Sequence, residues 1–202
     1  MARMKSDEKR RDIVRVAARA FQELGYERTS MLTIAERQRG SKQTVYNYFP
    51  SKEDLLRAVL DFDVADVADK ALGEFRAEKN LRQGLARLGH VYLERQLAPM
   101  AISSFRIVAT QPAESRIRKE FYRDILCAAW QQVADLFRAL MSEGTLRRSD
   151  PWTAAMHFKG LVLQDLLERQ LLGAADAIDP GEVEAAAGQA ADAFLMIYGP
   201  RA

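Results

Sequence analysis

Apolar side chains recur at helical spacings of three and four residues along nearly the whole chain. In the first such stretch, residues 7–24, Ile13, Ala17 and Phe21 share one face and arginines occupy the others. No segment shows the sustained alternation of apolar and polar residues, bounded by turn residues, that is typical of a strand. The pattern therefore predicts an all-α fold.

Residues that favour helix ends divide this pattern into elements. Gly25 suits the left-handed backbone that often follows a helix. The hydroxyls of Ser30 and Ser41 can cap the next two helices, and Pro50 disfavours helical geometry in the residue before it. We expect about nine helices, at about residues 7–24, 31–39, 42–49, 51–79, 81–97, 100–109, 113–143, 151–172 and 180–198.

The second and third helices are short and joined by a tight turn, which is the pattern of a helix-turn-helix. Val45 and Phe49 can anchor the third helix on the first two, so its other face is polar and cationic. Gln43 and Thr44 suit base edges in the major groove, and longer side chains can reach phosphates. A merely solvated helix face would show a similar pattern. The candidate DNA-contacting residues are Thr29, Ser30, Arg39, Ser41, Lys42, Gln43, Thr44, Tyr46, Asn47, Tyr48 and Lys52.

The distribution of charge agrees with this interpretation. Residues 1–52 carry 12 Lys and Arg against 6 Asp and Glu, whereas residues 53–202 carry 18 against 22. A basic region at one end of a chain is expected where that end meets phosphates, although a solvated terminus would also show it. We therefore predict a DNA-binding domain at residues 1–52 and a second helical domain at residues 53–202.

Three runs, Phe21–Met31, Ile34–Ala35 and Ser41–Leu56, closely resemble the tetracycline-repressor (TetR/AcrR) family. The most specific part is Ser-Lys-Gln-Thr-Val-Tyr-Asn-Tyr-Phe-Pro-Ser-Lys at residues 41–52. The resemblance implies an all-helical fold of about nine helices with an N-terminal DNA-binding module. It also implies a homodimer formed by the last two long helices, and a C-terminal pocket whose small-molecule ligand weakens operator binding.

The turn of the helix-turn-helix departs from the family pattern. Family members usually carry Ala-Gly-Val before the serine of the turn, where this chain has Gln38, Arg39 and Gly40. Either Gly40 supplies the unusual backbone angle one residue late, or Arg39 adopts it at some strain. Arg39 can also add a phosphate contact. The loss of the aliphatic side chain would loosen the two helices by ~1–2 kcal/mol.

The helices at residues 151–172 and 180–198 are the candidate dimer interface. The first is apolar nearly all round, and the second is rich in alanine, which lets helix axes approach closely. Packing of both helices within one subunit is the alternative. The candidate interface residues are Phe158, Val162, Leu166, Ala187, Ala191, Phe194, Leu195 and Tyr198.

An effector pocket implied by the resemblance would lie among the helices from about residue 53 to residue 170. Aromatic and apolar side chains there suggest a hydrophobic ligand, although each would equally suit a plain core position. The candidate lining residues are Phe62, Tyr92, Met100, Phe105, Tyr122, Trp130, Phe137 and His157.

The sequence offers little to support an enzyme. Neither histidine lies in a Glu-x-x-His pair, and the chain has no glycine-rich phosphate loop or nucleophile elbow, so we expect no metal and no cofactor. The single cysteine, Cys127, is interpreted as a small buried side chain rather than a redox sensor. The polar N-terminus and the lack of a long apolar run indicate a cytoplasmic protein.

The sequence pattern predicts a sequence-specific DNA-binding regulator, and the family resemblance implies that it responds to a ligand. Its partners would be a palindromic operator, a second copy of the chain and a small molecule. The most consistent interpretation is a repressor that the small molecule releases from the operator, although the sequence does not separate a repressor from an activator. A helical adaptor that binds only proteins is the alternative.

Overall fold

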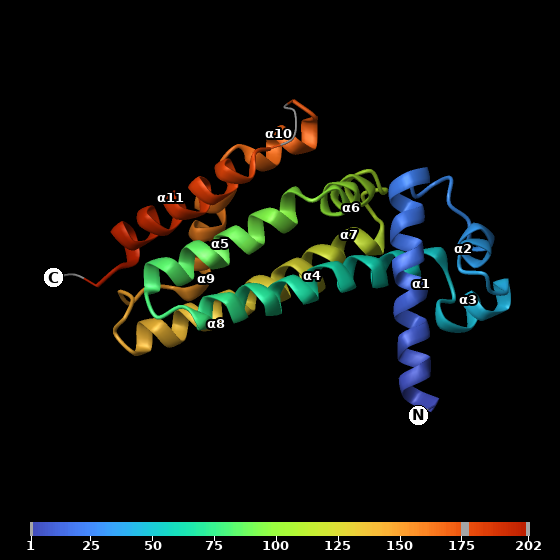
Figure 1. Cartoon of the computed structure of the whole chain (residues 1–202), viewed down its shortest axis with the longest axis horizontal. Coiled ribbons are helices and arrows are strands. Elements are labelled where there is room, and N and C mark those ends of the chain that lie inside the picture. Colours follow the sequence, from blue (N-terminus) through green and yellow to red (C-terminus); the bar gives the residue numbers. More distant parts are fainter. Residues whose placement is uncertain (1, 175–177, 201–202) are drawn as a thin grey trace. The chain divides into compact units, whose positions relative to one another are not determined.

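The structure is a computed structural model that describes residues 2–174 and 178–200. The described residues are mainly helical and contain no strand, so the predicted all-α fold is confirmed (Figure 1). The elements are α1 (Ala2–Leu24), α2 (Met31–Arg37), α3 (Lys42–Tyr48), α4 (Lys52–Ala77), α5 (Leu81–Leu97), α6 (Pro99–Ala109), α7 (Arg116–Glu120), the π-helical segment η1 (Phe121–Leu126), α8 (Cys127–Ser142), α9 (Pro151–Leu163), α10 (Leu166–Leu172) and α11 (Pro180–Tyr198).

Two of the predicted helices are interrupted. The stretch expected at 113–143 consists of α7, η1 and α8, and the stretch expected at 151–172 consists of α9 and α10. Between α9 and α10, Gln164 has a φ of 45° and Asp165 has a ψ of 0°. These angles resemble the two central positions of a type II′ turn, which favours glycine at the first of them. The break was not predicted because neither residue is a glycine or a proline.

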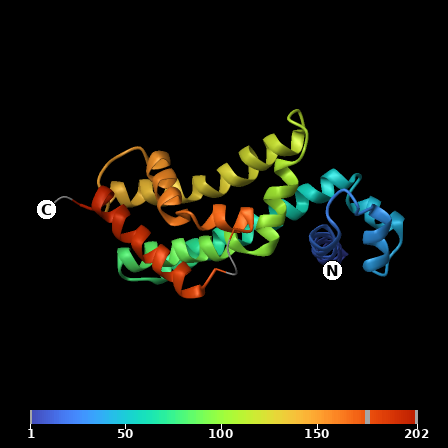
Figure 2. The ribbon, with the colours of Figure 1, turned by 90° about the horizontal axis from the view of Figure 1, so that it is seen from above.

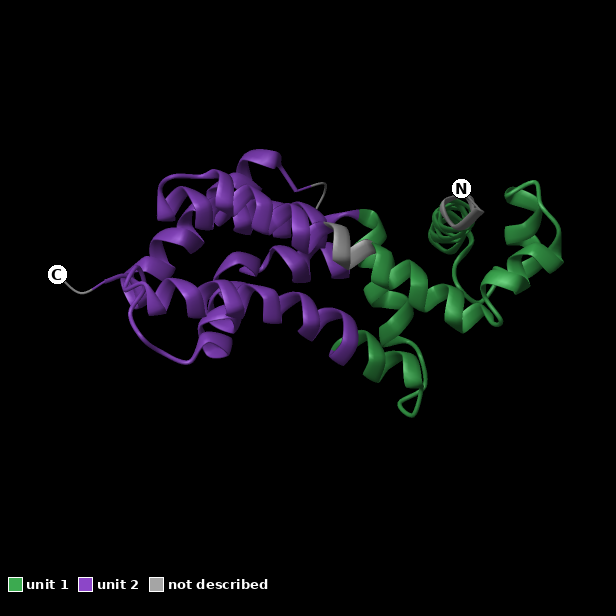
Figure 3. Cartoon of the chain, turned by 90° about the horizontal axis from the view of Figure 1, so that it is seen from below, with its two compact units in different colours: residues 1–63, 99–122 green, residues 64–98, 123–202 purple. Residues whose placement is uncertain are grey.

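The chain forms two compact units, and neither is a continuous stretch of sequence (Figure 3). Unit 1 comprises residues 1–63 and 99–122, and unit 2 comprises residues 64–98 and 123–202. The predicted boundary after residue 52 lies within unit 1, because the first turns of α4 belong to it together with α6 and α7.

Unit 1 contains the helix-turn-helix. The apolar stripe of α1 is buried, with Ile13, Ala17 and Phe21 at most 2% exposed, and α2 and α6 both pack against α1. Val45 and Phe49 are also buried, as the sequence predicts for the anchors of α3. These apolar contacts leave the polar side of α3 free.

Unit 2 is a helical bundle with an aromatic core. Helices α5 and α11 lie side by side, and α9 packs against both α8 and α11 (Figures 1 and 2). Phe137, Phe158 and Phe194 are fully buried and contact one another, with ring centroids 4.9–5.9 Å apart. Gly89 permits the close packing of α5, because a Cβ there would lie only 3.1 Å from Cγ2 of Val162.

No helix in the described ranges is long and apolar enough to cross a membrane.

Candidate nucleic-acid interface

Both short helices of the helix-turn-helix begin at a serine cap. The backbone N–H of Thr33 donates to Oγ of Ser30 at 3.0 Å, and the N–H of Thr44 donates to Oγ of Ser41 at 3.0 Å. Each hydroxyl satisfies one of the backbone donors that a helix start leaves free. The predicted caps therefore fix where α2 and α3 begin.

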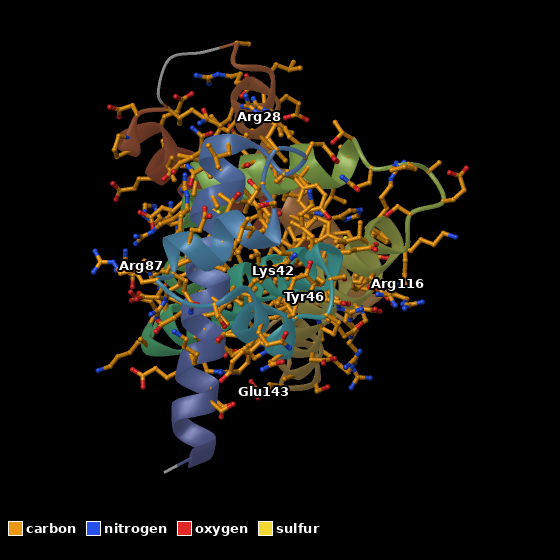
Figure 4. All side chains as sticks on the ribbon, turned by 90° about the vertical axis from the view of Figure 1, so that its right-hand side faces the viewer. Arg28, Lys42, Tyr46, Arg87, Arg116 and Glu143 are labelled. Atoms are coloured by element: carbon orange, nitrogen blue, oxygen red, sulfur yellow. The ribbon has the colours of Figure 1, made fainter. Side chains whose placement is uncertain are left out.

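One face of α3 is polar and open to solvent. Lys42, Gln43, Tyr46 and Asn47 are exposed and lie at positions i, i+1, i+4 and i+5, so they share one side of the helix. Nε2 of Gln43 donates to Oδ1 of Asn47 at 3.0 Å, and the Lys42 ammonium lies 5.5 Å from the centroid of the Tyr46 ring (Figure 4). These two i, i+4 pairs hold amide, hydroxyl and ammonium groups together on the outer surface of α3.

Thr44 and Tyr48 are less accessible to DNA than the four exposed residues of this face. Both are partly buried, and Oγ1 of Thr44 lies 2.9 Å from Oγ of Ser41. Thr44 therefore points back toward the helix cap. The side chains placed best to enter a groove are the four exposed residues named above.

Thr29 is a correction to the predicted set of DNA contacts. The residue is 1% exposed, and its Oγ1 lies 2.8 Å from the Gly25 carbonyl oxygen and 3.2 Å from the Ala20 carbonyl oxygen. Its hydroxyl therefore holds the end of α1 to the loop before α2. The sequence suggested a surface position because a threonine beside a helix start usually acts as a cap.

Lys52 also makes contacts within the protein. Its ammonium donates to the Tyr26 carbonyl oxygen at 2.9 Å and lies 4.2 Å from the centroid of the Tyr26 ring. Burial, together with the nearby carboxylates of Glu53 and Glu27, raises the pKa of the Tyr26 phenol to about 12. The lysine thus joins the start of α4 to the loop between α1 and α2.

In the turn between α2 and α3, Arg39 and not Gly40 adopts the unusual backbone angle. Arg39 has a φ of 53°, whereas Gly40 is not among the residues of positive φ. The N–H of Arg39 donates to the Glu36 carbonyl at 3.0 Å, and the N–H of Gly40 donates to the Ala35 carbonyl at 3.0 Å. This pair of bonds is a Schellman motif with arginine at the left-handed position. Arg39, which is exposed, therefore adopts the left-handed conformation that is strained for a residue with a side chain.

Gln38 occupies the space beside Gly40. A Cβ at Gly40 would lie 3.1 Å from Oε1 of Gln38, and both amide atoms of Gln38 are buried without a hydrogen-bond partner among the described residues. A side-chain amide thus partly replaces the apolar contact expected at this turn.

Sequence reasoning did not single out three further arginines of unit 1. Nε of Arg28, labelled in Figure 4, donates to the Leu24 carbonyl at 2.8 Å. The Arg10 guanidinium lies 5.0 Å from the centroid of the Phe49 ring, and Arg37 forms an ion pair with Glu23 at 2.5 Å. All three lie in the helix-turn-helix module. The excess of basic residues before position 52 was the only sequence feature that pointed to them.

The predicted pocket residues do not form one group. Tyr92 and Trp130 contact each other edge to face at 4.9 Å in unit 2, and Phe105 contacts Phe121 at 5.7 Å in unit 1. Phe137 is part of the closed core, so it is not free to line a pocket in this structure. Phe62 and Met100 are partly buried residues of unit 1.

Two more of these candidates lie at the surface. Tyr122 is 64% exposed, which does not fit the lining of an enclosed pocket. His157 is exposed, with Nδ1 2.7 Å from the hydroxyl of Tyr198. The sequence could not separate these residues from Trp130, because all of them are large side chains within helical stretches.

The predicted dimer residues lie in the core of one subunit. Leu195 is partly buried, and the other seven are at most 2% exposed: Phe158, Val162, Leu166, Ala187, Ala191, Phe194 and Tyr198. The subunit itself covers these side chains, as the alternative interpretation of the sequence proposed. The large apolar side chains that stay exposed on α11 are Met196, 88% exposed, and Ile197, 44% exposed.

A capped helix-turn-helix with an exposed polar second helix, on an otherwise helical chain, defines a DNA-binding regulator. Residues 13–59 match the family described as bacterial regulatory proteins, tetR family. Residues 83–200 match the C-terminal domain of AefR-like transcriptional repressors, which is more than half of the chain. The protein belongs to the TetR family of transcriptional regulators, a family of non-enzymatic proteins.

Solved structures of similar proteins cover nearly the whole chain. A TetR-family regulator from Mesorhizobium loti MAFF303099 is 26% identical, with a TM-score of 0.86 over 96% of this chain and 98% of that chain. The flavonoid-responsive regulator FrrA is 27% identical, with a TM-score of 0.74 over 97% and 100%. A TetR-family regulator from Pseudomonas syringae pv. tomato is 28% identical, with a TM-score of 0.67 over 96% and 98%. No curated protein matches the chain in sequence.

Proposed function

We propose that the protein is a dimeric repressor that binds a palindromic operator through α3 and leaves it when a small molecule binds unit 2. The observation that carries this proposal is the open face of α3, where Lys42, Gln43, Tyr46 and Asn47 are exposed while Val45 and Phe49 anchor the helix from behind. Such a face suits base edges and phosphates of a major groove. The same proposal puts the protein in the cytoplasm, with the DNA.

One family match and one similar protein support repression and control by a small molecule. The match to the C-terminal domain of AefR-like repressors favours repression over activation. The flavonoid-responsive regulator FrrA, 27% identical over nearly the whole chain, supports control by a small molecule.

Selection of bound DNA from a random library tests the DNA-binding proposal. We expect an inverted repeat, because a twofold dimer presents α3 to two half-sites. Gln43→Ala should change the preferred base at one position of each half-site by ~1–3 kcal/mol, while Tyr46→Ala should weaken binding to all sequences alike. No enriched sequence, together with binding that is insensitive to salt, would instead favour a protein-binding adaptor.

The proposed dimer uses the outward side of α9 and α11. On α11 the exposed residues include Ala185, Gln189, Met196 and Ile197, and Nε2 of Gln164 donates to Oε1 of Gln189 at 3.3 Å, which joins the two helices at this surface. Small side chains let helices approach, and the exposed apolar pair at the end of α11 gains most from being covered.

Light scattering after gel filtration tests the dimer. The wild-type chain should elute as a dimer at micromolar concentration, and Ile197→Asp should shift it toward the monomer without loss of helical circular dichroism. The matched control is Leu172→Asp, which adds the same charge at an exposed apolar residue of α10. A wild-type monomer, or equal effects of the two variants, would reject this interface.

A further inference from the structure

Lys159 is a cation that α9 places within the aromatic part of unit 2. The residue is partly buried, and its ammonium lies 5.9 Å from the centroid of the Trp130 ring. Among the described residues, no carboxylate lies within ion-pair distance of this ammonium. Lysine is rarely withdrawn from water without an opposite charge, because its ammonium loses hydration. An aromatic face returns only part of that loss.

The ring beside Lys159 is packed against a second aromatic ring, and a cysteine lies nearby. Trp130 contacts Tyr92 edge to face at 4.9 Å, and burial raises the pKa of the Tyr92 phenol, so its hydroxyl stays protonated and able to donate. Cys127 lies one helical turn before Trp130 on α8 and close enough to raise the pKa of Lys159, against the larger effect of burial, which lowers it. Burial thus leaves the ammonium under-hydrated in the absence of a ligand.

We infer that the effector of unit 2 carries an ionised acidic group on an aromatic ring, with Lys159 pairing the acidic group and Trp130 contacting the ring. This inference rests on the proposed function and specifies the chemistry of its effector. A cationic or neutral effector would add no opposite charge beside Lys159, whereas a carboxylate or phenolate would pair with its ammonium. Lys159 is partly exposed as a residue, so its side chain is not sealed inside the core.

Calorimetric titration of the full chain tests the inference with aromatic carboxylates of increasing size, from benzoate to naphthoate and cinnamate, each against its primary amide. The amide keeps the shape and removes the charge. We expect at least one carboxylate to bind tenfold or more tightly than its amide, since hydrogen bonds to charged groups are the stronger ones. If no carboxylate in the series exceeds its amide, the inference is wrong.

Substitutions then assign the preference to one residue. Lys159→Met keeps most of the apolar side chain and should reduce the preference for the carboxylate to about onefold, while Lys159→Arg should retain it. Lys70→Met is the matched control, because Lys70 is an exposed lysine of unit 2 on α4, and it should change nothing. A preference that survives in Lys159→Met overturns the inference.

A measurement without any ligand gives an independent check. Since no carboxylate of the described residues pairs with the Lys159 ammonium, Lys159→Met and Lys159→Gln should both raise the Tm of the free protein, and Lys70→Met should not. A lowered Tm in both Lys159 variants would show that the ammonium is already satisfied, against the inference. Operator binding measured on the same samples separates the two proposals, because loss of carboxylate preference with intact DNA binding rejects only the effector chemistry.

Discussion

Thr29 and Ser30 are neighbouring hydroxyl residues with different tasks. Ser30 caps α2 at the surface, whereas Thr29 is buried and bonded to carbonyls of the preceding loop. Local pattern predicts the cap at Ser30, because capping depends on residues three positions apart. The burial of Thr29 depends on how α1 packs against the loop, which the sequence around it does not contain.

We expect Thr29→Val to lower the free energy of unfolding by ~1–3 kcal/mol. Valine has the shape of threonine, but it leaves the carbonyl oxygens of Ala20 and Gly25 without their buried donor. Urea denaturation measures the loss, and Thr33→Val, at a partly exposed position of α2, serves as the comparison. Equal effects of the two variants would contradict the structural role given to Thr29.

Arg39 is the residue at which the turn departs from a relaxed backbone. A left-handed conformation costs an ordinary L-residue ~1–2 kcal/mol, and glycine is free of this cost. We therefore expect Arg39→Gly to be more stable than Arg39→Ala by about 1 kcal/mol in urea denaturation. Both variants lose the guanidinium, so the difference reports the backbone alone. An alanine variant as stable as the glycine variant would place the strain elsewhere.

At the scale of elements, the start of α4 is joined to the loop between α1 and α2 by Lys52 and Tyr26. The loop and the start of α4 are about 26 residues apart in sequence. Ser51 and the acidic residues Glu53 and Asp54 predict the start of α4, and the length of the Lys52 side chain suggested a phosphate contact. Its bond to the Tyr26 carbonyl could only be seen once the loop was placed.

The Tyr26 phenol gives this junction a pH dependence. Its pKa is about 12 in the folded protein and 10.0 without the fold, so between these values the unfolded chain releases the proton first. The stability that comes from the partly buried neutral phenol is complete below pH 10 and is lost as pH rises toward 12. In urea denaturation, the free energy of unfolding of Tyr26→Phe should fall less than that of wild type between pH 10 and about 12.

Tyr122→Phe is the control for this experiment, because the Tyr122 ring is largely exposed. It should follow the wild-type curve. If Tyr26→Phe follows that curve as well, the phenol of Tyr26 is not what makes the junction sensitive to alkali.

The break between α9 and α10 shows a second limit of the sequence. Gln164 adopts a positive φ without being glycine, so the helical pattern of residues 151–172 continues across it unmarked. The side chain of Gln164 bonds to Gln189 on α11, and Arg169 of α10 forms an ion pair with Glu182. Contacts with α11 accompany the break, and such tertiary contacts override local helix propensity.

At the scale of the whole molecule, the sequence predicted the fold class and the DNA-binding module but not the grouping of residues in unit 2. Residues 41–49 form a local motif, so the cap at Ser41 and the buried anchors Val45 and Phe49 follow from neighbouring positions. Tyr92, Trp130 and Lys159 come from α5, α8 and α9, and only the packing of these helices brings them together. Phe137 lies on the same helix as Trp130 yet belongs to the closed core.

The salt dependence of operator binding reports on the assembled molecule. Removing one cation that neutralises a phosphate of B-DNA reduces the slope of log K against log salt by about 0.9. If Arg39 of each subunit binds a phosphate, Arg39→Ala should reduce the slope by about 1.8 for a dimer. Filter binding or gel shift at several salt concentrations measures it. An unchanged slope would show that Arg39 binds no phosphate, and a change of about half that size would contradict a symmetric dimer.

The chain has two tryptophans, Trp130 and Trp152, and both belong to unit 2. The helix-turn-helix contains only tyrosine and phenylalanine as aromatic residues, so its indole emission is nil. Trp130 lies beside both Tyr92 and Lys159, where a bound ring would change the surroundings of the indole. The protein therefore carries its own optical reporter for unit 2, and a change in tryptophan emission on adding operator would reveal communication from the DNA to unit 2 without any label.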